Sequence, residues 1–102
     1  MIYDISVIRS FSTKTAQDIY DGVNSRYARK IPGELHTKIQ RLLDQINAVT
    51  KVDTLKMPPG NHLEKLSGNL KGFWSLRIND QWRIIFRWEE GDALDIDIID
   101  YH

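Results

Sequence analysis

The chain has 102 residues, of which 41% are hydrophobic and 27% are charged, with a formal net charge of zero and no cysteine. These values predict one domain over residues 1–102 with a single modest core, and they exclude disulfides, thiolate metal sites and cysteine nucleophiles. No apolar run approaches the ~18 residues that span a membrane, and no secretory signal begins the chain, so we expect a cytoplasmic protein with no membrane contact.

The charges are distributed unevenly along the chain. Residues 1–88 hold all fourteen Lys and Arg but eight Asp and Glu, a balance of +6, whereas residues 89–102 hold six acidic residues and no basic one. The neutral total argues against strong nonspecific binding of nucleic acid. One interpretation of the pattern is that the acidic end pairs with the basic body.

The first half of the chain predicts one strand and two helices. Residues 5–11 are β-branched and short, which favours a first strand. Ser12 or Thr13 can cap a short helix over about residues 14–21, which Gly22 ends. After a break at residues 31–33, apolar residues at helical spacing predict an amphipathic helix from Glu34 to about Val49.

The second half predicts a meander of strands. Residues 53–61 read as a turn-rich connection, and strands are expected over residues 73–78, 82–88 and 94–99. A tight hairpin turn at residues 79–81 and a turn at residues 89–92 separate them. The order of elements predicts an α+β fold with two helices packed on one face of a mainly antiparallel sheet of three or four strands.

Alternation along these strands assigns the large apolar side chains to one face, which we expect to cover the long helix and form the core. The residues of that face are Trp74, Leu76, Ile78, Trp82, Ile84, Phe86, Trp88, Leu94, Ile96 and Ile98.

The opposite face carries Arg77, Arg83 and Arg87. If Ile78 opposes Trp82, then Arg77 and Arg83 lie directly across from each other, and like charges in that arrangement need a compensating partner. Two kinds of partner fit. One is internal, namely Asp95 and Asp97 on the neighbouring strand, and the other is a phosphate backbone lying across the sheet.

Ribonucleic acid can be cleaved without a metal by groups of this kind. A base removes the proton of the 2′-hydroxyl, an acid protonates the departing 5′-oxygen, and cations stabilise the charge on phosphorus. Of the three histidines, His36 is expected at the surface, and His62 either faces the site or is solvated. His102 ends the chain after Asp100 and Tyr101, directly behind a strand that can hold its imidazole in place.

The residues at the C-terminus suit acid catalysis and base stacking. Nearby carboxylates favour the imidazolium form of His102, which fits a general acid or a phosphate-binding cation, and Tyr101 offers a ring for stacking a base. The spacing of the acidic residues from 92 to 100 does not match a calcium loop. We therefore expect neither a metal nor a cofactor.

Three stretches resemble the HigB family of toxins, within the RelE/ParE superfamily. They are PPGNHLEKLSGN at residues 58–69, GFWSLRINDQWRI at residues 72–84 and DYH at residues 100–102, and residues 8–11 are similar to the start of the family. The resemblance implies a RelE-like β-α-α-β-β-β(-β) fold and the toxin of a type II toxin–antitoxin system. It also implies a ribosome-dependent mRNA endoribonuclease that is neutralised by a helix-turn-helix antitoxin of the HigA type, through which alone it meets operator DNA.

The same resemblance assigns site residues. It implies catalytic roles for four residues: Asp100, Tyr101, His102 and Arg83. We expect four more to contact the substrate: Arg77, Arg87, Lys71 and His62. Some relatives carry a histidine and a lysine where this chain has Glu64 and Ser67, so the second acid or base is open, with His62 or Lys71 as possible substitutes.

Two other functions fit the same fold. One is a ParE-like poison of DNA gyrase, which binds protein and needs no acid–base chemistry, and the terminal histidine disfavours it. The other is a degenerate toxin that serves mainly as an antitoxin-binding partner, as Glu64, Ser67 and the zero net charge suggest.

Overall fold

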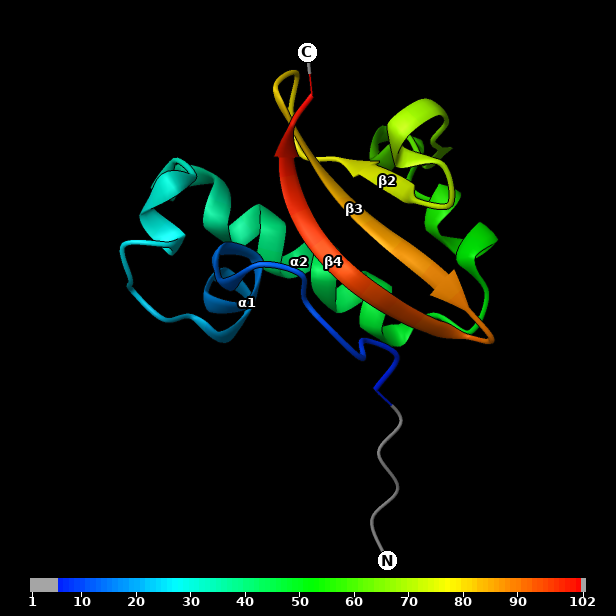
Figure 1. Cartoon of the computed structure of the whole chain (residues 1–102), viewed down its shortest axis with the longest axis horizontal. Coiled ribbons are helices and arrows are strands. Elements are labelled where there is room, and N and C mark those ends of the chain that lie inside the picture. The colour runs from blue at the N-terminus through cyan, green and yellow to red at the C-terminus, as the bar shows by residue number, and fades with distance from the viewer. Residues whose placement is uncertain (1–5, 102) are drawn as a thin grey trace, which may run out of the picture.

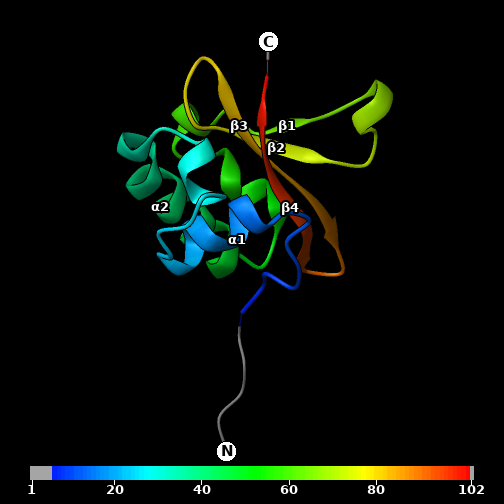
Figure 2. The ribbon, with the colours of Figure 1, turned by 60° about the vertical axis from the view of Figure 1, so that its left-hand side comes forward.

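The computed structural model describes residues 6–101 and consists of two helices packed on a four-stranded antiparallel sheet. The helices are α1 (Lys14–Asp21) and α2 (His36–Ala48), and the strands are β1 (Glu64–Lys65), β2 (Trp74–Arg77), β3 (Trp82–Glu89) and β4 (Asp92–Asp100), ordered β1-β2-β3-β4. Short 3-10 turns fill the connections: η1 (Ala28–Lys30), η2 (Gly33–Leu35), η3 (Val52–Lys56), η4 (Pro59–Asn61) and η5 (Gly68–Leu70). Figures 1 and 2 show both helices on one side of the sheet, which confirms the predicted α+β architecture.

Helix α1 begins and ends as its sequence predicts. The Thr13 hydroxyl accepts a hydrogen bond from the Ala16 amide at 3.3 Å, so Thr13 rather than Ser12 is the cap. Gly22 closes the helix in the left-handed region with φ of 73°. Inside the helix, the buried Asp18 carboxylate accepts a hydrogen bond from the Ser25 hydroxyl at 2.6 Å.

The Ser25 hydroxyl holds the pKa of Asp18 below its ordinary value. Burial opposes that shift, and the Lys14 ammonium, 3.3 Å from the carboxylate, supports it. The same Ser25 oxygen accepts a hydrogen bond from the Ala28 amide at 3.1 Å. The ionised Asp18 therefore ties α1 to the connection that leads into α2.

Helix α2 begins two residues later than the apolar pattern predicts, because Gly33–Leu35 forms a 3-10 turn in front of it. Its apolar stripe is buried against the sheet, as expected. The helix side of this core consists of Ile39, Leu42, Leu43 and Ile46, and the sheet side consists of Leu76, Ile78, Ile84, Phe86, Ala93, Ile96 and Ile98. The three tryptophans of the sheet are half-buried and pack against it.

The expected first strand is not a regular strand in the structure. Residues 6–11 run parallel to β4 and form two isolated bridges, Ile8 with Ala93 and Phe11 with Ile96. Between these bridges Asp95 adopts φ of 52°, and its amide donates to the Ser10 hydroxyl at 2.8 Å. This irregularity in β4 interrupts the ladder on which a continuous strand depends. Ile5, which the predicted strand included, lies outside the described residues.

The same irregularity shifts the register between β3 and β4. Ile85 pairs with Asp97, whereas Arg87 pairs with Leu94. The core position predicted for Leu94 is therefore wrong, because the shift buries Ala93 there instead and sets Leu94 opposite Arg87.

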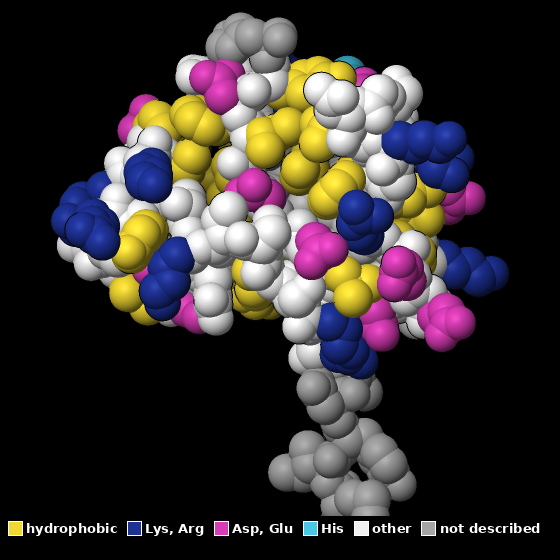
Figure 3. All heavy atoms as spheres, in the orientation of Figure 1, with side chains coloured by type: hydrophobic (Ala, Val, Ile, Leu, Met, Phe, Trp, Pro, Cys, Tyr) yellow, Lys and Arg dark blue, Asp and Glu magenta, His cyan; other side chains and the backbone are white. Residues whose placement is uncertain are grey.

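Surface charge follows the sequence pattern in part. Figure 3 shows Lys and Arg side chains gathered at the end of the molecule formed by the connection between α1 and α2, which carries Arg26, Arg29 and Lys30. Some of the acidic end does pair with the basic body, since Asp92 lies 3.2 Å from Arg9. No helix in residues 6–101 is long and apolar enough to cross a bilayer.

Candidate functional site

Arg83 is the centre of a polar cluster on the sheet face turned away from the helices. Its Nη2 donates to the His62 carbonyl at 2.6 Å, and its Nη1 lies 3.5 Å from Glu64 Oε2. The guanidinium carbon is 5.2 Å from the centroid of the Tyr101 ring. With 7% exposure, Arg83 is buried by these contacts and ties together three separate segments of the chain.

Short-range structure explains how these segments meet. The Asn79 side-chain oxygen accepts from the amides of Gln81 and Trp82, at 2.9 and 2.8 Å, and so shapes the hairpin between β2 and β3. That hairpin sets Arg77 directly opposite Arg83, which confirms the predicted register. Tyr101 is held after the end of β4 by a hydrogen bond from its amide to the Gln81 carbonyl, 2.6 Å long.

Strand β1 places the Glu64 carboxylate beside Arg83. Glu64 pairs with Ser75 and Lys65 pairs with Trp74, so β1 is an edge strand beside β2. The Lys65 ammonium lies 5.5 Å from the centroid of the Trp74 ring. This pairing leaves the Glu64 side chain 48% exposed while one of its oxygens contacts Arg83.

A hollow of about 230 Å³ opens beside the cluster, and we call it the Tyr101 hollow. Its walls are formed by Glu64, Lys65, Leu66, Ser67, Leu70 and Tyr101. A carboxylate, a hydroxyl and a phenol therefore lie around one space, whereas the Lys65 ammonium lies over the Trp74 ring on the opposite face of the sheet. Acid–base chemistry on a phosphate ester requires groups of this kind.

Arg77 and Arg87, which the alternation pattern grouped with Arg83, have partners of their own. Arg77 is ion-paired with Asp80 in the hairpin. Arg87 lies 3.3 Å from Asp95 and 4.5 Å from the centroid of the Phe73 ring. Four residues along β3 separate it from Arg83, a distance of about 13 Å at ~3.3 Å per residue. The three arginines thus share a face, but Arg87 is separated from Arg83, and Arg77, although opposite Arg83, is paired with Asp80.

The charges of Arg77 and Arg83 are compensated within the chain, but not by the two carboxylates, Asp95 and Asp97, that the sequence suggested. Asp95 does pair with Arg87, whereas Asp97 accepts a hydrogen bond from the Thr13 hydroxyl at 2.8 Å. Glu64 is the carboxylate beside Arg83, and Asp80 is the carboxylate beside Arg77.

The remaining predicted site residues differ in whether they contact Arg83. His62 contributes its backbone carbonyl to Arg83, and its imidazole is exposed. Asp100 accepts a hydrogen bond from the Gln81 side chain at 3.1 Å, and Lys71 is exposed on the connection between β1 and β2. His102 lies outside the described residues.

Glu64, which contacts Arg83, was not among the site residues predicted from the sequence. It stood out only as a departure from relatives, because β1 is two residues long and no local pattern predicts its pairing with β2. Within the described part of the chain, Arg83 Nε and Ser75 Oγ are buried without a hydrogen-bond partner. Unpaired buried polar atoms are uncommon in folded proteins and frequently occur at functional sites.

Metal ligands do not gather in this region. Residues 6–101 contain no group of three or more His, Asp or Glu side chains arranged to hold an ion.

Comparison with known proteins identifies the family. Residues 9–102 match the family model described as RelE-like toxin of type II toxin-antitoxin system HigB. The chain is 38% identical to Toxin HigB-1 of Vibrio cholerae over 84 residues, 82% of this chain and 86% of that protein. It is 30% identical to Endoribonuclease HigB of Proteus vulgaris over 97 residues, 94% of this chain and all of that protein.

A solved structure supports the fold independently. A chain of the YoeB–YefM complex from Staphylococcus aureus aligns with a TM-score of 0.55 at 22% identity, covering 93% of this chain and 97% of that one. The likeness at this identity concerns the fold, and it agrees with the RelE-like architecture expected from the sequence. Because the family model covers nearly the whole chain, this protein belongs to the HigB-like family of RelE-like toxins of type II toxin–antitoxin systems.

Proposed function

We propose that this toxin is a metal-independent endoribonuclease that cleaves mRNA on the translating ribosome in the cytoplasm. The observation that carries the proposal is the contact of Arg83 with Glu64 and Tyr101 at the rim of the Tyr101 hollow. The name of the Proteus vulgaris relative, an endoribonuclease, supports the same chemistry.

In the proposed reaction, the 2′-hydroxyl of one nucleotide attacks its own 3′-phosphate. Glu64 removes the hydroxyl proton, a bond forms between phosphorus and the 2′-oxygen, and the bond to the 5′-oxygen breaks. His102 gives its proton to the departing 5′-oxygen, and Asp100 helps to keep that imidazole charged. The products are a 2′,3′-cyclic phosphate and a free 5′-hydroxyl, and no metal-bound water takes part.

Arg83 responds to the charge that moves during this step. In the resting site the guanidinium is paired with the Glu64 carboxylate at 3.5 Å. When Glu64 takes up the proton, its charge disappears at the moment that negative charge grows on the phosphate oxygens. Arg83 then stabilises the phosphate in place of the carboxylate, in a buried setting where such a contact is strong.

The remaining residues position the strand. Tyr101 is 41% exposed above Arg83 and offers a ring on which a base stacks. Lys71 and the His62 imidazole reach phosphates near the hollow. Arg77, opposite Arg83, and Arg87, farther along β3, contact neighbouring phosphates, since exchanging an exposed or half-exposed carboxylate for a phosphate costs little.

The proposed partner is an antitoxin of the HigA type with a helix-turn-helix fold. The family description, which names a two-component system, supports an antitoxin. Contact with operator DNA is proposed to occur only through that partner.

The test uses ribosomes programmed with a defined mRNA, with cleavage mapped by primer extension and product ends analysed chemically. We expect Glu64→Gln and His102→Ala each to slow cleavage by about 10²–10⁴-fold, and Glu34→Gln, at an exposed carboxylate before α2, to cleave normally. Wild-type products should carry a 2′,3′-cyclic phosphate and a 5′-hydroxyl.

Two results would contradict the proposal. Equal cleavage by Glu64→Gln and wild type removes the assigned base, and 5′-phosphate ends indicate hydrolysis by an activated water. Intact mRNA together with blocked supercoiling by DNA gyrase would favour the ParE-like alternative.

A further inference from the structure

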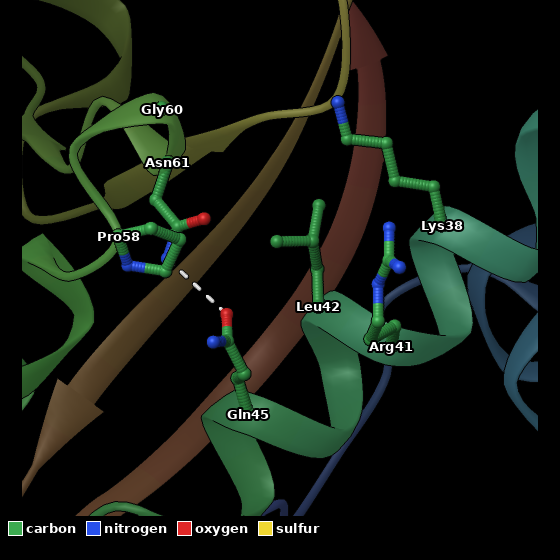
Figure 4. A pocket seen from close by; sticks show the side chains of 7 residues that line it. All are labelled: Lys38, Arg41, Leu42, Gln45, Pro58, Gly60 and Asn61. Atoms are coloured by element: carbon green, nitrogen blue, oxygen red, sulfur yellow. Dashed lines mark hydrogen bonds between the residues drawn. The ribbon is translucent and has the colours of Figure 1, made fainter.

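A second hollow lies on the other side of the segment that carries Glu64. It measures about 390 Å³ and separates the outer face of α2 from the η4 turn, and we call it the α2 hollow. Its lining consists of Lys38, Arg41, Leu42, Gln45, Pro58, Gly60 and Asn61. Figure 4 shows side chains of α2 on one wall and the Pro58–Asn61 turn on the facing wall.

The facing walls are joined by a defined polar contact. Asn61 is buried, and its amide nitrogen donates to Gln45 Oε1 at 3.2 Å, which is the dashed line in Figure 4, and to the Leu55 carbonyl at 3.1 Å. At the rim, the Lys38 ammonium donates to the Ile78 carbonyl of the β2–β3 hairpin. The hollow is therefore preformed, which reduces the conformational entropy lost when a partner binds.

The charge of the hollow is uncompensated. Lys38 and Arg41 are its charged residues, and none of the described residues that line it is acidic. Arg41 is exposed and forms no ion pair in residues 6–101. A partner that carries carboxylates is complementary to this rim.

The rest of the lining favours a polypeptide over RNA. Leu42 and Pro58 supply apolar surface on the two facing walls, and Met57, next to Pro58 in the chain, is a 66% exposed side chain of a kind that adapts to apolar partners. The Gln45 amide suits hydrogen bonding to a peptide backbone. Sequence-tolerant binding of single-stranded RNA relies on aromatic rings for stacking, and none of the described residues that line this hollow is aromatic.

We infer that the α2 hollow is the docking site for an acidic segment of the antitoxin, with an apolar side chain over Leu42 and Pro58 and a carboxylate between Lys38 and Arg41. The inference rests on the proposed function to the extent that it takes an antitoxin as the partner. Asn61 directly precedes His62, whose carbonyl binds Arg83, so a bound segment contacts the wall that also supports the catalytic cluster.

Two variants block the hollow in different ways. Arg41→Glu reverses the charge of an exposed side chain. Gly60→Phe fills the space, since nothing lies within 4 Å of a Cβ at Gly60. The matched controls are Arg29→Glu, on the connection between α1 and α2, and Gly33→Phe, where a Cβ also meets nothing within 4 Å.

Affinity is measured by calorimetry on the purified toxin and the antitoxin encoded in the neighbouring reading frame, in the absence of RNA. We expect the two hollow variants to bind at least about tenfold more weakly, and the two controls to stay within about twofold of wild type. Circular dichroism melting of each variant checks that it is folded. An Asp→Lys or Glu→Lys substitution in the antitoxin that restores binding to Arg41→Glu identifies the contacting carboxylate.

Growth assays separate this inference from the nuclease proposal. The hollow variants should stay toxic and escape neutralisation. Folded hollow variants that bind the antitoxin with wild-type affinity overturn the docking site. Variants that lose toxicity while they keep wild-type affinity for the antitoxin overturn the docking site as well. They indicate that the rim of the α2 hollow binds RNA. Failure of mRNA cleavage contradicts the nuclease alone, because the binding measurement involves no RNA.

Discussion

The two hollows on either side of the 58–67 segment differ in how their charges are arranged. In the Tyr101 hollow, the Glu64 carboxylate and the buried Arg83 guanidinium contact each other beneath an aromatic ring. In the α2 hollow, Lys38 and Arg41 lie beside the apolar side chains of Leu42 and Pro58, and no carboxylate is in the lining. Opposite charges in contact suit a reaction in which charge moves, whereas uncompensated charge beside apolar side chains suits recognition of a partner.

The difference arises from one short stretch of chain with two sides. Asn61 contacts α2 and the turn before it, the next residue contributes its carbonyl to Arg83, and Glu64 lies two positions farther on. Substitutions confined to one side should therefore affect one function, and a substitution at Asn61, the part of the wall that both sides share, should affect both.

The largest effect is expected at Arg83, the centre of the proposed catalytic cluster. Arg83→Met removes the cation that pairs with Glu64 and supports the Tyr101 ring, so mRNA cleavage should fall by about 10²-fold or more, while affinity for the antitoxin stays within about twofold. Arg87→Met is the control, because Arg87 lies about 13 Å farther along β3. This substitution should slow mRNA cleavage by less than about tenfold. Equal losses in the two variants would show that the whole arginine face, and not this cluster, carries the activity.

The shared wall is expected to couple the two functions. Asn61→Ala leaves the buried carbonyl of Leu55 and the part-buried carbonyl of Met57 without the amide that now donates to them. We expect a loss of about 1–3 kcal/mol in the free energy of unfolding, measured with denaturant, together with weaker cleavage and weaker antitoxin binding. Asn69→Ala, at an exposed position, is the control. A variant that is destabilised yet normal in both functions would contradict the shared wall.

A smaller effect is expected at the ring above Arg83. Tyr101→Phe keeps the cation–π contact and the stacking surface, so cleavage should remain within a few-fold of wild type. Tyr101→Ala removes both and should slow cleavage by about tenfold, the equivalent of ~1.4 kcal/mol. Primer extension on programmed ribosomes measures both rates. If the Phe variant is as slow as the Ala variant, the phenol hydroxyl and not the ring is required.

The smallest effect at neutral pH is expected far from both hollows, at Asp18. Its pKa is depressed in the fold by the Ser25 hydroxyl, so the ionised carboxylate stabilises the protein above its ordinary pKa, and this contribution is lost as the pH falls through the lowered value. Asp18→Asn should therefore be less stable at neutral pH, and the difference should narrow on acidification. Unfolding midpoints between about pH 3 and 7 test this, with the exposed Asp21→Asn as control. A constant difference would show that the pKa is not depressed.

Regular periodicity made most of the fold predictable. Both helices, the β2–β3 hairpin and the pairing of Arg77 with Arg83 follow from apolar spacing, from the cap and stop residues at Thr13 and Gly22, and from the tight turn at Asn79. The irregular backbone at Asp95 was not predictable, because an extra residue in a strand changes no local pattern. It alone explains the error at Leu94 and the broken N-terminal strand.

The site was predictable in its residue types and not in its contacts. The terminal motif and Arg83 could be assigned from the family resemblance, and Arg83 and Tyr101 do lie together. The role proposed for Glu64 depends on the two-residue strand β1 and on burial of the Arg83 guanidinium, which are long-range properties. Alternation along β3 groups Arg87 with Arg83 on one face. It does not reveal that Arg83 contacts Glu64 whereas Arg87 contacts Asp95.

The most direct test is a structure of the toxin on a ribosome whose mRNA carries a 2′-O-methyl group at the cleaved nucleotide, so that the attack is blocked. We expect the base to stack on Tyr101, the scissile phosphate to lie within about 3 Å of the Arg83 guanidinium, and the 2′-oxygen to lie within about 3 Å of Glu64. An mRNA that crosses the sheet near Arg87, with Glu64 and Arg83 still paired and the Tyr101 hollow empty, would contradict this expectation.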